Sequence, residues 1–312
     1  MSKQHFLSKD QFHLFWDESH KPVLTIADGD TVVMETSEVT NDFFTLNSTT
    51  EDIAKLDLNA CYPLTGPIYV EGAQPGDTLA VEILDLKVGS WGWMSVLPGM
   101  GLLSDIFTEP ALRVFDLSNG EYVPFREDIK VPFQPFLGTM GVCPKGAKDQ
   151  TVMPPGTFGG NMDIRHLKKG ATLYLPIEVE GALFSCGDGH AVQGDGEICV
   201  TAMECPLTVT LRFSLQKGKK IRSPQFFTPS PLTGPVDKEG YFATTGVNSD
   251  LFQAAHDATE DMVNHIAETY GLAPVDAYFL ASLCVDLKIC EIVDAGQYIV
   301  SAHLPLSVFE KK

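Results

Sequence analysis

Basic residues are scarce in this chain of 312 residues. It contains 22 Lys and Arg against 41 Asp and Glu, a formal net charge of -19 at pH 7. Nucleic acids and anionic membrane surfaces are bound through a concentrated basic face. The main basic cluster, residues 217–222, is typical of a solvated turn. We therefore expect neither a nucleic-acid nor a membrane partner.

Long apolar runs are also missing. No uninterrupted stretch approaches the ~18 apolar residues of a membrane-spanning helix. The polar start Met1–His5 leads into no apolar segment of signal-peptide length. These two absences predict a cytoplasmic protein. Acidic enzymes of this size often form symmetric dimers, so a homodimer is the expected assembly.

The chain lacks a C-x-x-C pair. Its seven cysteines are odd in number and scattered, a pattern typical of reduced thiols and not of a disulfide framework or a structural zinc cage. Cys186 lies in a polar segment, where it could serve as a nucleophile or a soft ligand. No second His lies nearby to activate it, so a small buried thiol is the alternative.

Alternating and β-branched runs predict a mainly β fold. The predicted strands are 22–26 and 30–36 (a hairpin turning at Asp28-Gly29), 68–71, 78–86, 174–180, 198–203, 207–215, 285–293 and 298–303. Two helices are predicted near the end, one from Ser249 as N-cap to a stop at Gly271, the other over 274–283. We expect a β-sandwich or jelly-roll-like core from 1–86 and 151–210. A small β-barrel-like insertion would occupy 87–150, and an α+β subdomain 211–312.

The segment 186–197 concentrates polar chemistry between two predicted strands. Asp188 and His190 stand two apart, so they project to one side of an extended backbone. Glycines at 187, 189, 194 and 196 permit positive φ, which lets neighbouring side chains converge. A carboxylate with an imidazole suits Zn²⁺, whereas oxygen ligands alone suit Ca²⁺ or Mg²⁺. The alternative is a tight hairpin whose Asp side chains cap their own turn.

A second glycine-rich segment, 159–163, ends in a carboxamide and a carboxylate. Asn161 and Asp163 are again two apart, which makes this segment the expected second contributor to one centre. Glu35, near the end of the first predicted hairpin, is a reserve metal ligand. Thr65, on the turn-rich stretch 63–67, is a weaker candidate for the wall of the cleft.

The segment Cys186–Glu197 resembles the signature of the acetamidase/formamidase family. Further matches, in the family's order, are Pro63–Pro67, Gly159–Asp163, Asp276–Tyr278 and Ser301–Pro305. The resemblance implies a metal-dependent hydrolase that converts short aliphatic amides to ammonia and a carboxylate, on a mainly β fold with a smaller α/β portion.

Amide hydrolysis needs an activated water and a protonated leaving nitrogen, which a divalent cation and a carboxylate can supply. On that basis we expect a divalent metal, Zn²⁺ in preference to Ca²⁺. The predicted ligands are Asp163, Asp188 and His190, with Glu35 in reserve; Glu197, or else Asp195, is the predicted general base; and Gln193, Asn161 and Thr65 are predicted to bind the small amide substrate. Two alternatives stay open: a non-catalytic metal-binding β scaffold, and a thiol amidase that uses Cys186.

Overall fold

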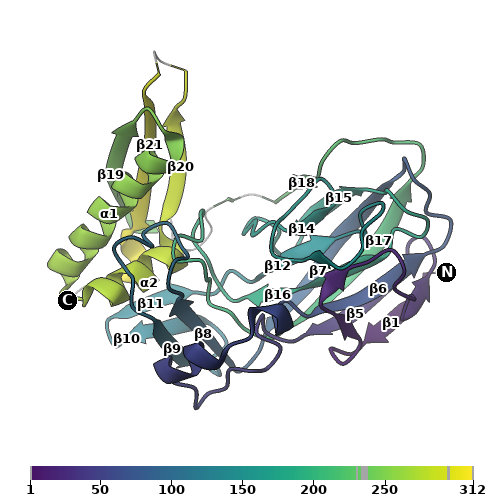
Figure 1. Ribbon diagram of the computed structural model, residues 1–312, viewed down its shortest axis with the longest axis horizontal. Coiled ribbons are helices and arrows are strands. Elements are labelled where there is room, and N and C mark those ends of the chain that lie inside the picture. The colour runs from purple at the N-terminus through teal and green to yellow at the C-terminus, as the bar shows by residue number, and fades with distance from the viewer. Residues whose placement is uncertain (1, 230, 233–237, 294–295, 311–312) are drawn as a thin grey trace.

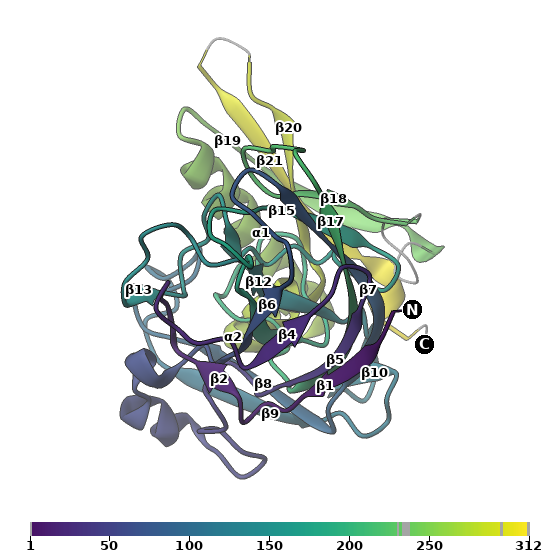
Figure 2. The ribbon, with the colours of Figure 1, turned by 90° about the vertical axis from the view of Figure 1, so that its right-hand side faces the viewer.

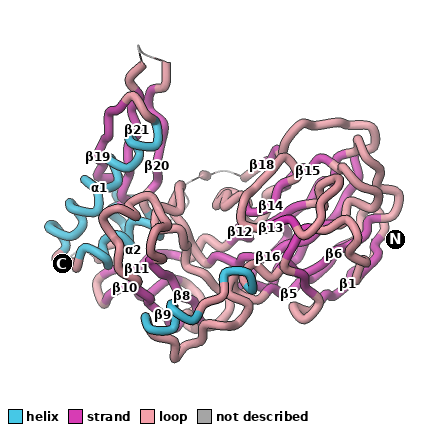
Figure 3. Tube along the Cα trace, in the orientation of Figure 1, coloured by secondary structure: helices cyan, strands magenta, loops and turns pink. Residues whose placement is uncertain are grey.

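The computed structural model describes residues 2–229, 231–232, 238–293 and 296–310. Strands dominate it (Figures 1 and 3), as the sequence predicts. One six-stranded sheet has the order β1-β5-β17-β7-β15-β18. Its strands are β1 (Gln4–Leu7), β5 (Thr31–Thr36), β17 (Leu207–Gln216), β7 (Thr78–Val88), β15 (Thr172–Pro176) and β18 (Gln225–Phe227).

A second six-stranded sheet has the order β14-β12-β16-β6-β2, with β4 also paired to β6. These strands are β14 (Gly159–Asn161), β12 (Phe136–Gly141), β16 (Phe184–His190), β6 (Leu64–Val70), β2 (Phe12–His13) and β4 (Leu24–Ile26). The two sheets pack through apolar side chains: Phe184 meets Phe213 with ring centroids 5.1 Å apart, and the Cys186 thiol lies 3.7 Å from the Met34 sulfur. Figure 2 shows strands of both sheets around this shared core.

Residues 87–150 form open pairs of strands. Strand β8 (Trp91–Val96) pairs with β9 (Ala111–Asp116), and β10 (Tyr122–Arg126) pairs with β11 (Ile129–Pro132). Strand β12 instead joins the second sheet. Within the described residues no closed barrel occurs. The short pair β3 (Phe15–Trp16) and β13 (Gln150–Thr151) lies at the edge.

The C-terminal part is α+β in character and stands apart from the two large sheets in Figure 1. Its three-stranded sheet has the order β19 (Tyr241–Asn248), β21 (Tyr298–Pro305), β20 (Asp286–Glu291). Helices α1 (Leu251–Tyr270) and α2 (Pro274–Cys284) follow the predicted ranges closely. The elements given for the described residues also include the short 3-10 helices η1 (Thr50–Lys55), η2 (Leu58–Ala60) and η4 (Leu306–Val308). No helix among the described residues is long and apolar enough to cross a membrane.

Three local predictions are wrong. The expected hairpin at 28–29 does not form, because β4 pairs with β6 while β5 pairs with β1 and β17 in the other sheet. The segment 198–203 is not a strand. Conversely, much of the expected polar loop is strand β16, which is buried throughout. Glycine makes this possible: a Cβ on Gly189 would lie 2.5 Å from the carbonyl oxygen of Cys205.

Candidate metal and amidase site

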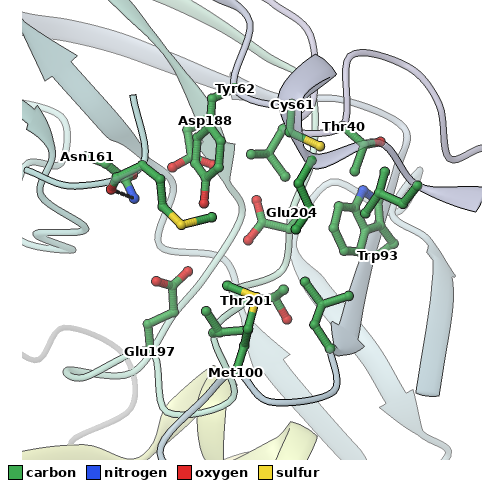
Figure 4. A pocket seen from close by; sticks show the side chains of 16 residues that line it. Thr40, Cys61, Tyr62, Trp93, Met100, Asn161, Asp188, Glu197, Thr201 and Glu204 are labelled. Carbon is green, nitrogen blue, oxygen red and sulfur yellow. Dashed lines mark hydrogen bonds between the residues drawn. The ribbon is translucent and has the colours of Figure 1, made fainter. Parts of the chain in front are cut away.

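A small pocket lies at the end of β16, with a cavity volume of about 40 Å³. The carboxylates of Asp188, Glu197 and Glu204 face it from different segments of the chain (Figure 4). The aromatic side chains of Tyr62 and Trp93 form part of the pocket wall, and the remaining lining residues are largely aliphatic. A cluster of acids in so small a space is costly unless protons or a cation balance the charge.

The imidazole of His190 lies at the centre of these acids. Its Nε2 is 3.3 Å from Asp188 Oδ1, 3.3 Å from Glu204 Oε2 and 3.9 Å from Glu197 Oε1. The His190 side chain is only 1% exposed. Asp188 and His190 thus lie within reach of one another, although the backbone at Asp188 is left-handed and not extended as the spacing argument assumed.

Asp163 joins the same centre from the loop that follows β14. Gly138 of β12 shows this most directly: a Cβ built there would lie 2.5 Å from Asp163 Oδ1, 2.5 Å from Asp188 Oδ2 and 2.9 Å from His190 Cε1. Only glycine leaves room for these three side chains to converge. The two glycine-bearing segments thus contribute to one centre, as the sequence predicts.

The backbone at the acids differs from the expectation. Of the four glycines in 187–196, only Gly196 has positive φ, at 120°. The left-handed region is occupied by the acids themselves, with φ of 50° at Asp163, 59° at Asp188 and 44° at Glu197. Such conformations are unfavourable for residues with a Cβ, and they cluster at functional sites.

Burial and mutual repulsion raise the pKa values of the acids at this centre. Burial, with the charge of Asp188, raises the pKa of Asp163 to about 7. Burial and neighbouring Asp163 raise the pKa of Glu197 well above its usual value, and burial also raises that of Glu204. Burial alone would lower the pKa of His190, but Glu204 and Asp188 outweigh it and hold this pKa well above its usual value.

The donor set fits a divalent cation. Two overlapping groups bring one ligand atom from each residue within 4.8 Å of the others: Asp163, His190 and Glu197; and Asp188, His190 and Glu204. Asp163 Oδ1 and His190 Nδ1 are buried without a hydrogen-bond partner. Buried polar atoms rarely stay unpaired unless a water or an ion completes them. Carboxylates with one imidazole suit Zn²⁺ and related ions better than Ca²⁺.

The two predicted carboxamides lie beside this centre. Gln193 is 1% exposed and donates from Nε2 to the carbonyl oxygen of Asp163 at 3.1 Å. Asn161 lines the pocket and donates from Nδ2 to the carbonyl oxygen of Met153 at 3.2 Å. The Thr139 hydroxyl lies 2.8 Å from Asn161 Oδ1 and 3.3 Å from Asp188 Oδ2.

Three predicted site residues lie elsewhere. The carboxylate of Asp195 is 3.2 Å from Arg165 Nε and 3.5 Å from His166 Nε2, outside both groups of potential ligands. Thr65 is buried and donates from Oγ1 to the backbone carbonyl of Glu35 at 2.8 Å. The Glu35 side chain borders a different cavity. Strand pairing on β5 and β6 turns Glu35 and Thr65 away from the pocket, whereas Asp195 is held aside by Arg165 and His166.

The Cys186 thiol points into the packed core beside Met34 and is fully buried. Burial raises its pKa far above the usual value for cysteine, which opposes formation of the thiolate that a nucleophile requires. The structure therefore disfavours the thiol-amidase alternative.

Glu204 is the residue that sequence reasoning missed. It is 2% exposed, and its backbone bridges both Trp93 and His190. One signal was available: the charge of Glu204 interrupts the apolar run 198–207, and acids buried in apolar surroundings are often functional.

Comparison with known proteins agrees with this geometry. A profile of the Acetamidase/Formamidase family matches residues 1–148 and 145–311. The chain belongs to the acetamidase/formamidase family. The expectation of an amidohydrolase is thereby confirmed at the level of the family. Among its relatives is a formamidase from Methylophilus methylotrophus, 26% identical over 99% of this chain and 92% of that protein.

Solved structures share the architecture of this chain. An acetamidase from Bacillus halodurans is 34% identical, with a TM-score of 0.69 over 97% of each chain. A gamma lactamase from Delftia acidovorans superposes with a TM-score of 0.91 over 97% of this chain and 90% of that one. It is only 24% identical, so this likeness shows the fold alone.

Proposed function

We propose that this protein hydrolyses short linear amides such as formamide and acetamide, releasing ammonia and a carboxylate with the help of a divalent cation. The convergence of Asp163, Asp188 and His190 above Gly138 carries this proposal. The names of the family members supply the substrate class. The pocket volume of about 40 Å³ suits a substrate of a few heavy atoms.

The cation would be held by Asp163, Asp188 and His190, with Glu204 as a further ligand. When bound there, a divalent ion would supply Lewis-acid chemistry, which polarises a carbonyl and lowers the pKa of water. His190 favours Zn²⁺ as the native ion, and the three carboxylate ligands leave Ca²⁺ as the alternative.

Glu197 is the proposed general base and acid. Its side chain is 17% exposed, against 4% for Asp188 and 3% for Glu204, so it is the most accessible of the three to a water or a substrate. A carboxylate there can accept the proton of an attacking water and pass it to the amide nitrogen, which must be protonated to leave. Because Asp195 is paired with Arg165 and His166, we assign it no proton transfer.

Gln193 and Asn161 are proposed to orient the substrate. Each carboxamide nitrogen carries two N–H donors. One donor of Gln193 is bonded to the backbone carbonyl of Asp163, and one donor of Asn161 is bonded to the backbone carbonyl of Met153. The second proton of Asn161 can donate to a substrate carbonyl oxygen as charge develops on it.

The test measures ammonia release and metal content together. Glu197→Gln is expected to retain metal and lose at least 100-fold in kcat, a loss typical of removed acid–base catalysis. Asp188→Asn is expected to lose both metal and activity. The matched control is Asp195→Asn, which should keep the metal and most of the activity.

Full activity in Glu197→Gln would contradict the assignment of the base. Bound metal in the wild type without turnover of formamide or acetamide would favour the alternative of a metal-binding scaffold. The homodimer stays a prediction, which size-exclusion chromatography with light scattering would test. The cytoplasmic location also stays a prediction, which cell fractionation would test.

A further inference from the structure

A second cavity borders the pocket that holds the acids. Its volume is about 190 Å³, and we call it the outer chamber. The two cavities share four lining residues: Leu58, Cys61, Tyr62 and Met153. These four residues form the threshold between the inner pocket and the outer chamber.

The inner pocket is too small for more than the reacting group. A water-sized body occupies about 10–15 Å³ on this volume measure, so 40 Å³ holds roughly three such bodies. An amide group with one further carbon fills it. Any longer substrate must therefore extend beyond the inner pocket, and the outer chamber is a cavity that shares a wall with it.

The lining of the outer chamber differs chemically from the inner pocket. None of its nine lining residues is charged. Beyond the threshold, Leu14, Phe15 and Val152 give it apolar walls, with Asn59 and Thr151 exposed at its rim. Such a lining favours an aliphatic occupant and offers nothing to pair with a charged one.

The backbone of the threshold is fixed in place. Tyr62 has a left-handed φ of 61°, and its N–H donates to the Val39 carbonyl at 2.7 Å. The Met153 carbonyl accepts from Asn161 Nδ2 at 3.2 Å. Asn161, the side chain proposed to orient the amide, is thus bonded to the backbone of the threshold residue Met153. This bond fixes the orienting group relative to the threshold that a substrate tail would cross.

We propose that the outer chamber binds the aliphatic acyl chain of a linear amide whose carboxamide occupies the inner pocket. This inference rests on the proposed amidase function and extends its substrate class to linear amides with a longer aliphatic tail. Tyr62 and Met153 are then specificity-determining residues, because they set the width through which the tail passes.

The test compares acetamide with hexanamide. Each buried methylene contributes about 0.8 kcal/mol, so a seated tail is expected to give hexanamide a KM at least ten-fold below that of acetamide. Thr151→Trp, which fills the chamber from its rim, should lower kcat/KM for hexanamide at least ten-fold more than for acetamide. Asn59→Trp fills it from another rim position and should act alike.

Lys148→Trp is the matched control, since Lys148 is exposed just before β13, three residues from Thr151, and lines neither cavity. It should leave the ratio of the two substrates unchanged. Equal losses for both substrates in Thr151→Trp and Asn59→Trp, or no preference for hexanamide in the wild type, would overturn the inference while leaving amide hydrolysis intact.

Failure of the amidase function itself would show separately, as absence of turnover with every amide. In that case calorimetry with hexanamide still decides the inference about the chamber. Binding by the wild type that Thr151→Trp abolishes would support it, and no binding by the wild type would refute it.

Discussion

At the scale of single residues, the acids of the site hold unfavourable backbone conformations. The left-handed region costs a residue with a Cβ roughly 1–2 kcal/mol, and Asp163, Asp188 and Glu197 all occupy it. Each conformation directs a carboxylate toward His190 instead of along the strand or loop. Part of the folding free energy is therefore spent on convergence of the site.

Gly138→Ala should separate site geometry from fold stability. The new methyl group would lie 2.5 Å from two carboxylate oxygens, so Asp163 and Asp188 must move apart. We expect at least ten-fold weaker metal binding and a similar loss of amidase activity. Titration with a competing chelator measures the first. Wild-type metal affinity in this variant would show that the two acids do not share an ion.

The buried side chain of His13 should make the free energy of unfolding depend on pH. Burial, with the nearby charge of His20, lowers the pKa of His13 to about 4. Its Nδ1 lies 2.7 Å from the Phe15 carbonyl oxygen and its Nε2 lies 2.8 Å from Ser185 Oγ, which suits a neutral ring that donates from Nδ1 and accepts at Nε2.

Because the folded pKa is below the ordinary 6.5, the unfolded chain binds more protons between these values. The stability that neutral His13 provides is complete above pH 6.5 and is lost as pH falls toward 4. Between pH 7.5 and 5 the loss is on the order of 2 kcal/mol. In urea unfolding, the free energy of unfolding of His13→Gln should fall less than that of the wild type between pH 7.5 and 5, by this amount. An equal fall in both proteins would contradict the low pKa of His13.

At the scale of elements, the ends of helix α1 show what local sequence can decide. Gly271 ends the helix in the left-handed conformation, with φ of 62°, as predicted. The N-cap is Asp250 and not the predicted Ser249: the Asp250 carboxylate accepts from the Gln253 N–H at 2.9 Å. The two adjacent residues are both good caps, and the chain direction entering the helix selects between them.

Asp250→Ala should therefore destabilise the protein by about 1 kcal/mol, the usual effect of removing an N-cap. Ser249→Ala is the matched control and should change the free energy of unfolding by less than half as much. Urea unfolding of the two variants decides the assignment, and a larger effect for Ser249→Ala would reverse it.

The segment 198–203 shows where composition misleads. Its apolar and β-branched residues predict a strand, but two of its backbone N–H groups bond to side chains instead of a neighbouring strand. The Cys199 N–H donates to Ser282 Oγ at 3.2 Å, and the Ala202 N–H donates to Glu204 Oε1 at 2.9 Å. Irregular backbone satisfied in this way brings Glu204 to His190, which a regular strand would not do.

At the scale of the whole molecule, a buried ion pair ties the site to the C-terminal part. Arg165 Nη2 lies 2.8 Å from Asp286 Oδ2, with the two side chains 4% and 2% exposed. Asp286 Oδ1 accepts from the Asp195 N–H at 3.1 Å, and the Leu287 N–H donates to the Asp195 carbonyl at 2.9 Å. Strand β20 thus holds the loop that presents Glu197.

Arg165→Met should destabilise the protein by about 3–5 kcal/mol, because it leaves the Asp286 charge buried without its partner. The double variant with Asp286→Leu should recover most of that loss, since no unpaired charge remains. Denaturant unfolding measures both. A double variant no more stable than Arg165→Met would show that packing, and not charge burial, dominates at this position.

The sequence by itself indicated the family, the mainly β class, the two helices and four of the residues near the centre: Asp163, Asp188, His190 and Glu197. Strand alternation, the Gly271 stop and the spacing within 159–163 and 186–197 are local signals, so they survive without knowledge of the fold. The cytoplasmic location, the homodimer and the subdomain boundaries stay predictions.

Only the tertiary structure decided which acids share the pocket. Glu35, Thr65 and Asp195 have suitable chemistry, but strand pairing and the Arg165 ion pair direct them elsewhere. Glu204 reaches the pocket directly after the irregular segment 198–203, whose amino-acid composition wrongly predicts a strand. The physical reason is that a site needs side chains to converge in space, and convergence depends on long-range pairing and on left-handed backbone, which spacing along the chain does not encode.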